Sequence, residues 1–176
     1  MNVMEIVKEI LFVTIPALLV LLTAYLLIRK TIENDREKRR HEVILESSKT
    51  ITPVRLQAYE RLTLFLERIS IESLIMRTNK KGMDAKTLHS TLLTTIRSEY
   101  DHNLAQQIYV SPQAWEVIKI ARSNTIKLIN TIAEKIPPTA TGADFSKNLL
   151  EAVMDMDEEP AKIALEYLKK EISRMI

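Results

Sequence analysis

An unbroken apolar run lies near the N-terminus. Residues 10–28 read ILFVTIPALLVLLTAYLLI, without one charged side chain. At about 1.5 Å per residue, a helix of this length spans roughly 28 Å, close to the hydrocarbon thickness of a bilayer. A soluble core helix keeps polar groups on one face, and a signal peptide places positive charge before a shorter run that ends at small residues. The pattern therefore predicts an uncleaved transmembrane helix over residues 10–28.

Positive side chains follow this run and are scarce before it. Residues 1–9 contain only Lys8, whereas six basic residues lie in residues 29–40. The positive-inside rule places residue 29 onward in the cytoplasm and residues 1–9 outside as a short stub. Basic groups this close to a membrane also attract anionic lipid headgroups. The candidates for such contact are Arg29, Lys30, Arg36, Lys38, Arg39 and Arg40.

Residues 29–52 predict a charged helical stalk. Opposite charges recur at helical spacing, as in Asp35 and Arg39, but each such pair contributes only a few tenths of a kcal/mol. The segment SSKTIT at 47–52 predicts a break in the helix. Pro53 suits the first position of a new helix, because its missing N–H needs no partner there.

From Pro53 onward, apolar residues recur at helical spacing and predict four or five helices. A kink is expected at Ser70 and a left-handed terminator at Gly82. Expected N-caps are Asp84, Ser111, Asp144 and Asp157, and residues 137–142 form a linker. The expected inward positions are Leu56, Tyr59, Leu62, Leu64, Phe65, Leu66, Ile69, Leu74 and Ile75 in residues 53–77; Leu88, Leu92, Leu93, Ile96, Tyr100, Leu104 and Ile108 in 84–109; Ile118, Ala121, Thr125, Leu128 and Ile132 in 112–136; Phe145, Leu149 and Val153 in 144–154; and Ala161, Leu165, Leu168, Ile172 and Met175 in 160–176.

The fold class that follows is all-α, with one N-terminal transmembrane helix, a charged helical stalk and an antiparallel bundle of four to five helices. The short connections favour antiparallel neighbours. The predicted organisation is a stub at 1–9, the transmembrane helix at 10–28, the stalk at 29–52 and a cytoplasmic bundle at 53–176. The spacing from Ile118 to Ile132 alternates between three and four, which is typical of a coiled-coil seam and offers a surface for self-association.

Composition narrows the chemistry. The chain has two glycines, three histidines and no cysteine, so a disulfide framework, a thiolate metal site and a cysteine nucleophile are excluded. No glycine-rich phosphate loop, calcium loop or nucleophile-and-base pair is present. The net charge of +2 is too small to imply a polyanionic partner. We therefore expect no catalytic residue, no cofactor and no enzymatic activity.

Glu99 and His102 have the Glu-x-x-His spacing of a di-iron helical bundle. Such a site needs a second Glu-x-x-His and two further inward glutamates. Lys38 precedes His41 and Lys86 precedes His89 at the corresponding positions, so the set is incomplete. A metal-dependent enzyme remains the least favoured hypothesis.

A nucleic-acid or ribosome-binding face is an alternative. Lys119, Arg122 and Lys127 follow Trp115, but Glu116 and Glu134 interrupt the basic patch, and stacking aromatics are few. We consider a nucleic-acid partner unlikely.

Hydrogen-bonding side chains concentrate between two apolar segments, in SEYDHNLAQQIYVSPQAW (98–115). Tyr100, Asn103 and Gln107 lie beside the apolar stripe of their helix, within reach of a neighbouring helix. Polar groups at a core boundary must be hydrogen-bonded, so the cluster is either a structural corner or a docking edge for a partner. The polar corner, as we call it, comprises Tyr100, His102, Asn103, Gln106, Gln107, Tyr109 and Trp115.

Three segments resemble the signature segments of an uncharacterised family of small single-span membrane proteins of Bacteroidota. They are RLQAYERLTLFLERI (55–69), EYDHNLAQQIYVS (99–111) and AWEVIK (114–119). The resemblance covers residues 53–132 and implies a bacterial inner-membrane protein with a cytoplasmic helical domain. It carries no activity and no catalytic residues. The favoured hypothesis is a membrane-anchored interaction module, an accessory subunit or adaptor, that contacts other inner-membrane proteins or associates with itself.

Overall fold

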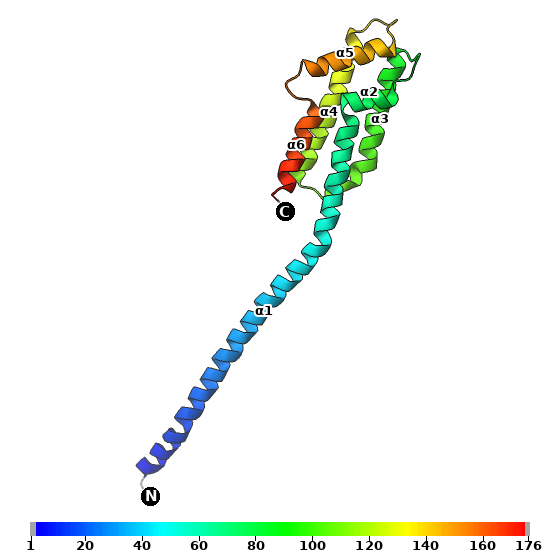
Figure 1. The fold of residues 1–176 in the computed structure, drawn as a ribbon. Coiled ribbons are helices and arrows are strands. Elements are labelled where there is room, and N and C mark those ends of the chain that lie inside the picture. The colour runs from blue at the N-terminus through cyan, green and yellow to red at the C-terminus, as the bar shows by residue number, and fades with distance from the viewer. Residues whose placement is uncertain (1–2, 175–176) are drawn as a thin grey trace. The chain divides into compact units, whose positions relative to one another are not determined.

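The structure, a computed structural model, describes residues 3–174, apart from the side chains of several residues among the first 50. The described residues are helical and include no β-strand, which confirms the predicted all-α class (Figure 1). The elements are α1 (Val3–Ile69), α2 (Ile71–Thr78), α3 (Ala85–Asn103), the 3₁₀ helix η1 (Leu104–Ile108), α4 (Pro112–Lys135), α5 (Gly142–Met154) and α6 (Pro160–Ile172).

Helix α1 is continuous across the predicted break. It runs from Val3 to Ile69, so the expected interruption at 47–52 and the helix start at Pro53 are wrong. A proline inside a helix removes one backbone hydrogen bond, but its fixed φ is compatible with helical geometry. The chain divides into two compact units, Met1–Ile51 and Thr52–Ile176, each described by itself below.

The first unit is the N-terminal part of α1. From Thr14 to Arg39 the helix is long and apolar enough to cross a membrane, with a mean hydropathy of 1.7 in its most apolar window. Its apolar side chains have no partner within the unit: Phe12 is 85 % exposed, Leu21 68 % and Ile28 60 %. This stretch overlaps the predicted transmembrane helix over residues 14–28.

In the second unit, the end of α1 runs beside α3, α4 and α6, and α5 crosses one end of them (Figure 1). Helix α4 packs against α3, α5 and α6, and α3 also packs against α2 and α5. The stripe predicted on α1 is confirmed, except that Leu64 is 59 % exposed and Leu56 is half-buried. The residues of that stripe that are buried are Tyr59, Leu62, Phe65, Leu66 and Ile69.

Ser70 separates α1 from α2, as the sequence predicts. Its ψ of 143° ends the helical geometry, and its hydroxyl donates to the carbonyl of Glu67 at 2.8 Å. The first N–H of α2, on Ile71, donates to the Glu159 carboxylate at 2.7 Å. A second link reaches α6 from α1, where the Tyr59 hydroxyl donates to Glu171 Oε1 at 2.7 Å.

The helix predicted to reach Tyr109 ends earlier. Helix α3 stops at Asn103, and the chain continues as the 3₁₀ helix η1. A 3₁₀ helix has three residues per turn, so the stripe of α3 does not continue along η1. Leu104 and Ile108, expected in the core, are therefore 42 % and 73 % exposed.

The predicted caps at Asp84 and Ser111 are confirmed, and two others are wrong. Asp84 accepts from the N–H of Thr87 and Ser111 from that of Ala114. Helix α5 is capped by Thr141, with Asp144 completing a capping box as its third residue. Helix α6 follows Glu159 and not Asp157, with Pro160 at its start.

The structure explains why each of the two glycines occupies its position. Gly82 has a φ of +84° and lies in a turn closed by Met83 N–H and Lys80 C=O. It follows α2 by several residues, since that helix already ends at Thr78. At Gly142, a Cβ would meet Asn79 Oδ1 and the Met83 carbonyl at 3.0 Å, because the loops before α3 and α5 are bridged there.

The seam predicted on α4 is buried within the chain itself. Ile118, Ala121 and Thr125 are buried, but Ile129 replaces Leu128 and Ile132, which are only half-buried. Helix α4 makes its most extensive packing with α6, whose Ala161, Leu165 and Leu168 are buried as predicted. The predicted inward residue Met175 lies outside the described residues.

Candidate functional site

Tyr100 lies in an aromatic cluster that joins three helices. Its ring stacks on Trp115 of α4 with centroids 5.5 Å apart, and Phe65 of α1 lies 6.0 Å away. The Arg122 guanidinium lies 4.2 Å from the centre of the Tyr100 ring, in cation–π geometry. Tyr100 and Trp115 are half-buried and pack against the core of this chain, so they already have partners within it.

His102 and Asn103 bond to their own helix. Nδ1 of His102 lies 2.6 Å from the carbonyl of Ser98, and the Asn103 amide donates to the carbonyl of Glu99 at 2.8 Å. These bonds, each to the carbonyl four residues earlier, hold both side chains against their own helix. The Asn103 amide thus bonds within α3, and no described bond joins it to a neighbouring helix.

The side chains of the remaining corner residues, Gln106, Gln107 and Tyr109, form no hydrogen bond with a described residue. Gln106 is half-buried and Gln107 exposed. The carbonyl of Tyr109 accepts from Arg55 of α1 at 3.1 Å, while its side chain is 38 % exposed. With Leu104 and Ile108, these residues give η1 an outward face that mixes apolar and amide groups.

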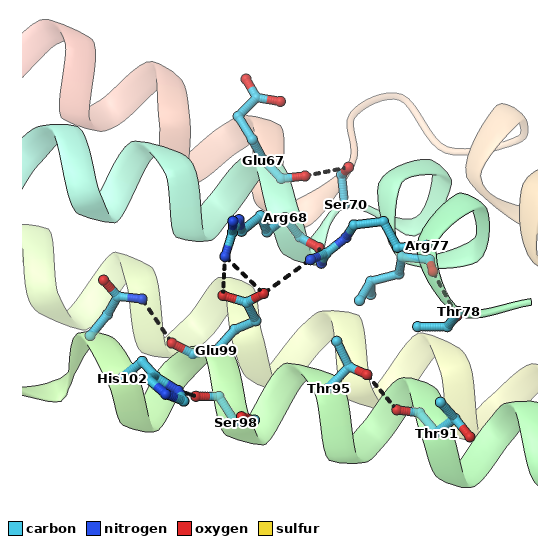
Figure 2. Close-up of polar contacts among 12 residues, drawn as sticks. Glu67, Arg68, Ser70, Arg77, Thr78, Thr91, Thr95, Ser98, Glu99 and His102 are labelled. Carbon is cyan, nitrogen blue, oxygen red and sulfur yellow. Dashed lines mark hydrogen bonds and ion pairs between the residues drawn. The ribbon is translucent and has the colours of Figure 1, made fainter.

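Glu99 is held by two arginines. Figure 2 shows the guanidinium groups of Arg68 from α1 and Arg77 from α2 converging on its carboxylate. Arg68 Nη1 lies 3.2 Å from both carboxylate oxygens, and Arg77 Nη1 lies 3.0 Å from Oε1. Arg77 Nη2 also donates to the carbonyl of Arg68 at 2.7 Å, which ties α2 to the end of α1.

The two arginines keep the Glu99 carboxyl ionised and occupy both of its oxygens. Partial burial raises the pKa of the Glu99 carboxyl, but the hydrogen bonds from Arg77 and Arg68 outweigh it and lower the pKa below its ordinary value. Both oxygens already accept from cations, and His102 is bonded to its own helix. The Glu-x-x-His spacing thus brings no pair of free ligands together, and no metal-binding cluster occurs among residues 3–174.

The basic face considered for nucleic acid is also engaged. Lys119 pairs with Glu116, which raises the pKa of the Lys119 amine, and Arg122 lies over Tyr100. One face of the Trp115 ring is stacked on Tyr100 and the side chain is half-buried, which leaves less of the ring available to a base. Of the basic residues proposed there, only Lys127 is exposed without a described ion pair.

The basic residues after the apolar run are exposed in the first unit. Arg29 pairs with Glu33 at 3.3 Å, with both side chains about two-thirds exposed. Such a pair contributes little in water and leaves the arginine accessible. The exposed members of the predicted set are Arg29, Lys30, Arg36, Lys38 and Arg39, whereas the side chain of Arg40 lies outside those described.

A cavity that the sequence did not indicate lies where α3 begins and α4 ends. It has a volume of about 420 Å³, and the side chain of Phe145 from α5 forms part of its wall. His89 Nε2 lies 2.8 Å from Asn130 Oδ1, and the rings of His89 and Phe145 meet edge-on with centroids 6.1 Å apart. His89 and Asn130 lie 41 residues apart on different helices, so the sequence did not indicate that they pair.

A comparison with family models places the chain. A family described as a family of unknown function (DUF7935) matches residues 5–175. The chain belongs to this family. No curated protein and no solved structure matches it. Membership of an uncharacterised family is thereby confirmed, and the finer parts of the resemblance, Bacteroidota and a single membrane span, remain predictions.

Proposed function

We propose that this member of DUF7935 is a single-span protein of a bacterial inner membrane, with its helical domain in the cytoplasm. One observation carries the proposal: the apolar stretch of α1 has every described side chain from Phe12 to Ile28 exposed. Monomeric soluble proteins rarely expose a contiguous apolar surface of this size, whereas a bilayer covers it. Basic residues concentrated after the stretch support a cytoplasmic location for the domain.

The same proposal gives the domain a non-enzymatic role, as an accessory subunit or adaptor that docks another inner-membrane protein. The docking surface is the outward face of η1: Leu104, Gln107, Ile108 and Tyr109, with Gln106 at its edge. Ile108 is 73 % exposed and Leu104 42 %. Apolar groups beside unpaired amides fit the composition of protein interfaces.

The basic segment adds a second contact, with anionic lipid headgroups. Each basic residue near an anionic surface contributes about 1 kcal/mol, which orients the segment without anchoring the protein alone. The exposed acidic residues Glu33, Asp35 and Glu37 reduce this attraction. The apolar stretch therefore dominates membrane attachment.

Site-specific photo-crosslinking in cells tests the docking role. A photoreactive residue at position 107 should form one discrete adduct with another membrane protein, to be identified by mass spectrometry. Ile108→Asp should abolish the adduct, whereas Ile163→Asp, a matched change at another exposed isoleucine, should not. Adducts with this chain alone would contradict the hetero-complex and indicate self-association. Adducts with ribosomal components would favour a nucleic-acid partner, which also predicts that binding of the purified chain to ribosomes weakens steeply with salt.

A further inference from the structure

The cavity where α3 begins and α4 ends carries an inference independent of the docking surface. We propose that it binds a small zwitterion with an apolar side chain, of the class of an aromatic α-amino acid. The walls combine apolar groups with two opposite charges that no described residue neutralises. A volume of about 420 Å³ lies at the lower end of the range for small-molecule sites, which is too little for a dinucleotide.

The polar groups of the cavity are arranged in two facing rows. Lys86 precedes His89 by three residues on α3, and Glu134 follows Asn130 by four on α4, so each pair shares one helix face. The bond between His89 and Asn130 joins the rows. Helices α3 and α4 run side by side in opposite directions (Figure 1). Lys86, near the start of α3, and Glu134, near the end of α4, therefore lie on the same side of that bond.

Neither of these charges has a partner in the described chain. No ion pair joins Lys86 or Glu134 to each other or to another described side chain, and both are exposed at the mouth of the cavity. Asn130 uses its oxygen to accept from His89, which leaves its NH₂ group free to donate. One ammonium, one carboxylate and one amide donor therefore line the same opening.

Each helix end has the same sign of partial charge as the charged side chain beside it. Helix α3 begins at Ala85, so Lys86 lies at the positive end of its dipole. Helix α4 ends at Lys135, so Glu134 lies near the negative end of its dipole. A ligand carboxylate is favoured beside Lys86 and Asn130, and a ligand ammonium beside Glu134.

The apolar wall selects the side chain of the ligand. Ile136, Pro137 and Pro138 line the cavity from the linker after α4, whereas Phe145, which also borders it, is fully buried and offers a ligand no contact surface. The exposed faces of the two prolines offer flat apolar contact, which suits an aromatic ring. An aliphatic side chain would also enter but would contact these flat surfaces less completely.

Calorimetric titration of the full chain in detergent micelles tests the proposal, with protein-free micelles as the blank. The probes are L-phenylalanine, phenethylamine without the carboxylate, 3-phenylpropanoate without the amine, and L-alanine without the ring. L-Phenylalanine should bind saturably, and each analogue roughly tenfold more weakly, because each loses a charged hydrogen bond or the apolar contact.

Two variants locate the site. Glu134→Gln and Lys86→Gln should each weaken L-phenylalanine binding roughly tenfold. Glu60→Gln and Lys162→Gln remove exposed charges elsewhere and should leave it unchanged. The fluorescence of the single tryptophan, Trp115, confirms that every variant is folded.

Three results would overturn the proposal. The first is an absence of saturable binding at millimolar L-phenylalanine. The second is equal binding of phenethylamine or 3-phenylpropanoate, which would mark an apolar cavity that receives one side chain of a protein partner. The third is binding that Glu134→Gln and Lys86→Gln leave intact. The result is independent of the docking role, because the titration requires no partner protein.

Discussion

Arg68 on α1 donates to both carboxylate oxygens of Glu99 on α3, at 3.2 Å each. Arg77 of α2 adds a third bond to the same carboxylate, so one acidic side chain connects three helices at the point where α1 ends. The Glu99 side chain is 16 % exposed, whereas those of Arg68 and Arg77 are 57 % and 37 % exposed. Solvent therefore screens the charges of the two arginines more than it screens the charge of the carboxylate.

Glu99→Gln should reduce the free energy of unfolding of the helical domain by about 1–2 kcal/mol, because the arginines lose a charged acceptor and solvent screens part of the effect. Urea unfolding followed by Trp115 fluorescence measures it. Glu116→Gln, which breaks only the exposed pair with Lys119, should change stability by less than about 0.5 kcal/mol. Equal changes in stability for the two variants would show that the cluster stabilises the domain no more than an exposed ion pair does.

The same cluster gives an acid dependence. The pKa of Glu99 is lowered in the folded chain, so its contribution is present above the ordinary carboxyl pKa of 4.5 and is lost as the pH falls below it. The stability difference between the native chain and Glu99→Gln should therefore shrink as the pH is lowered from 6 towards 3. A difference that stays constant over this range would show that the charge of Glu99 does not contribute.

Tyr59 provides an alkaline counterpart. Burial and the hydrogen bond to Glu171 raise the pKa of Tyr59 to about 12, from an ordinary value of 10.0. A raised pKa favours the neutral phenol in the folded state, so its contribution is complete below pH 10 and is lost as the pH rises towards 12. Tyr59→Phe should lower stability by about 1–2 kcal/mol at pH 8 and by less at pH 11. Unfolding midpoints at the two pH values measure this, and parallel curves would contradict it.

The two glycines should respond differently to alanine. Gly142→Ala places a Cβ 3.0 Å from Asn79 Oδ1 and the Met83 carbonyl, and should cost about 1–2 kcal/mol by forcing the bridged loops apart. Gly82→Ala meets no atom within 4 Å but is strained by its φ of +84°, at a cost of about 1 kcal/mol. Gly82→Asn should recover part of the loss, because asparagine tolerates this conformation, whereas Gly142→Asn should not. Thermal unfolding of the four variants tests the distinction.

The sequence predicted the helices well where their signals are local. The periodicity around Tyr59, the cap at Asp84 and the serine before Pro112 each depend on neighbours within a few residues. The sequence misplaced a helix start where two neighbouring residues could each serve as the N-cap. Thr141 caps α5 although Asp144 is an equally good cap, because in the capping box each of the two side chains accepts from the backbone N–H of the other residue.

The candidate site was predictable only in part. The concentration of polar groups at residues 98–115 indicated a corner, but not that Asn103 bonds to its own helix or that η1 turns Ile108 outward. The cavity was missed because Lys86 and His89 on α3 are more than 40 residues away from Asn130 and Glu134 on α4. Each is unremarkable in its own segment, and only the packing of α3 on α4 brings them together.

Single-cysteine labelling in spheroplasts tests the central claim, that α1 crosses the membrane once and leaves the helical domain in the cytoplasm. The native chain has no cysteine, so one introduced residue gives an unambiguous signal. A membrane-impermeant maleimide should label Asn2→Cys in intact spheroplasts and Lys80→Cys only after they are permeabilised, with both variants retained in membranes after an alkaline wash. Release of the protein by that wash, or labelling of Lys80→Cys in intact spheroplasts, would contradict the account.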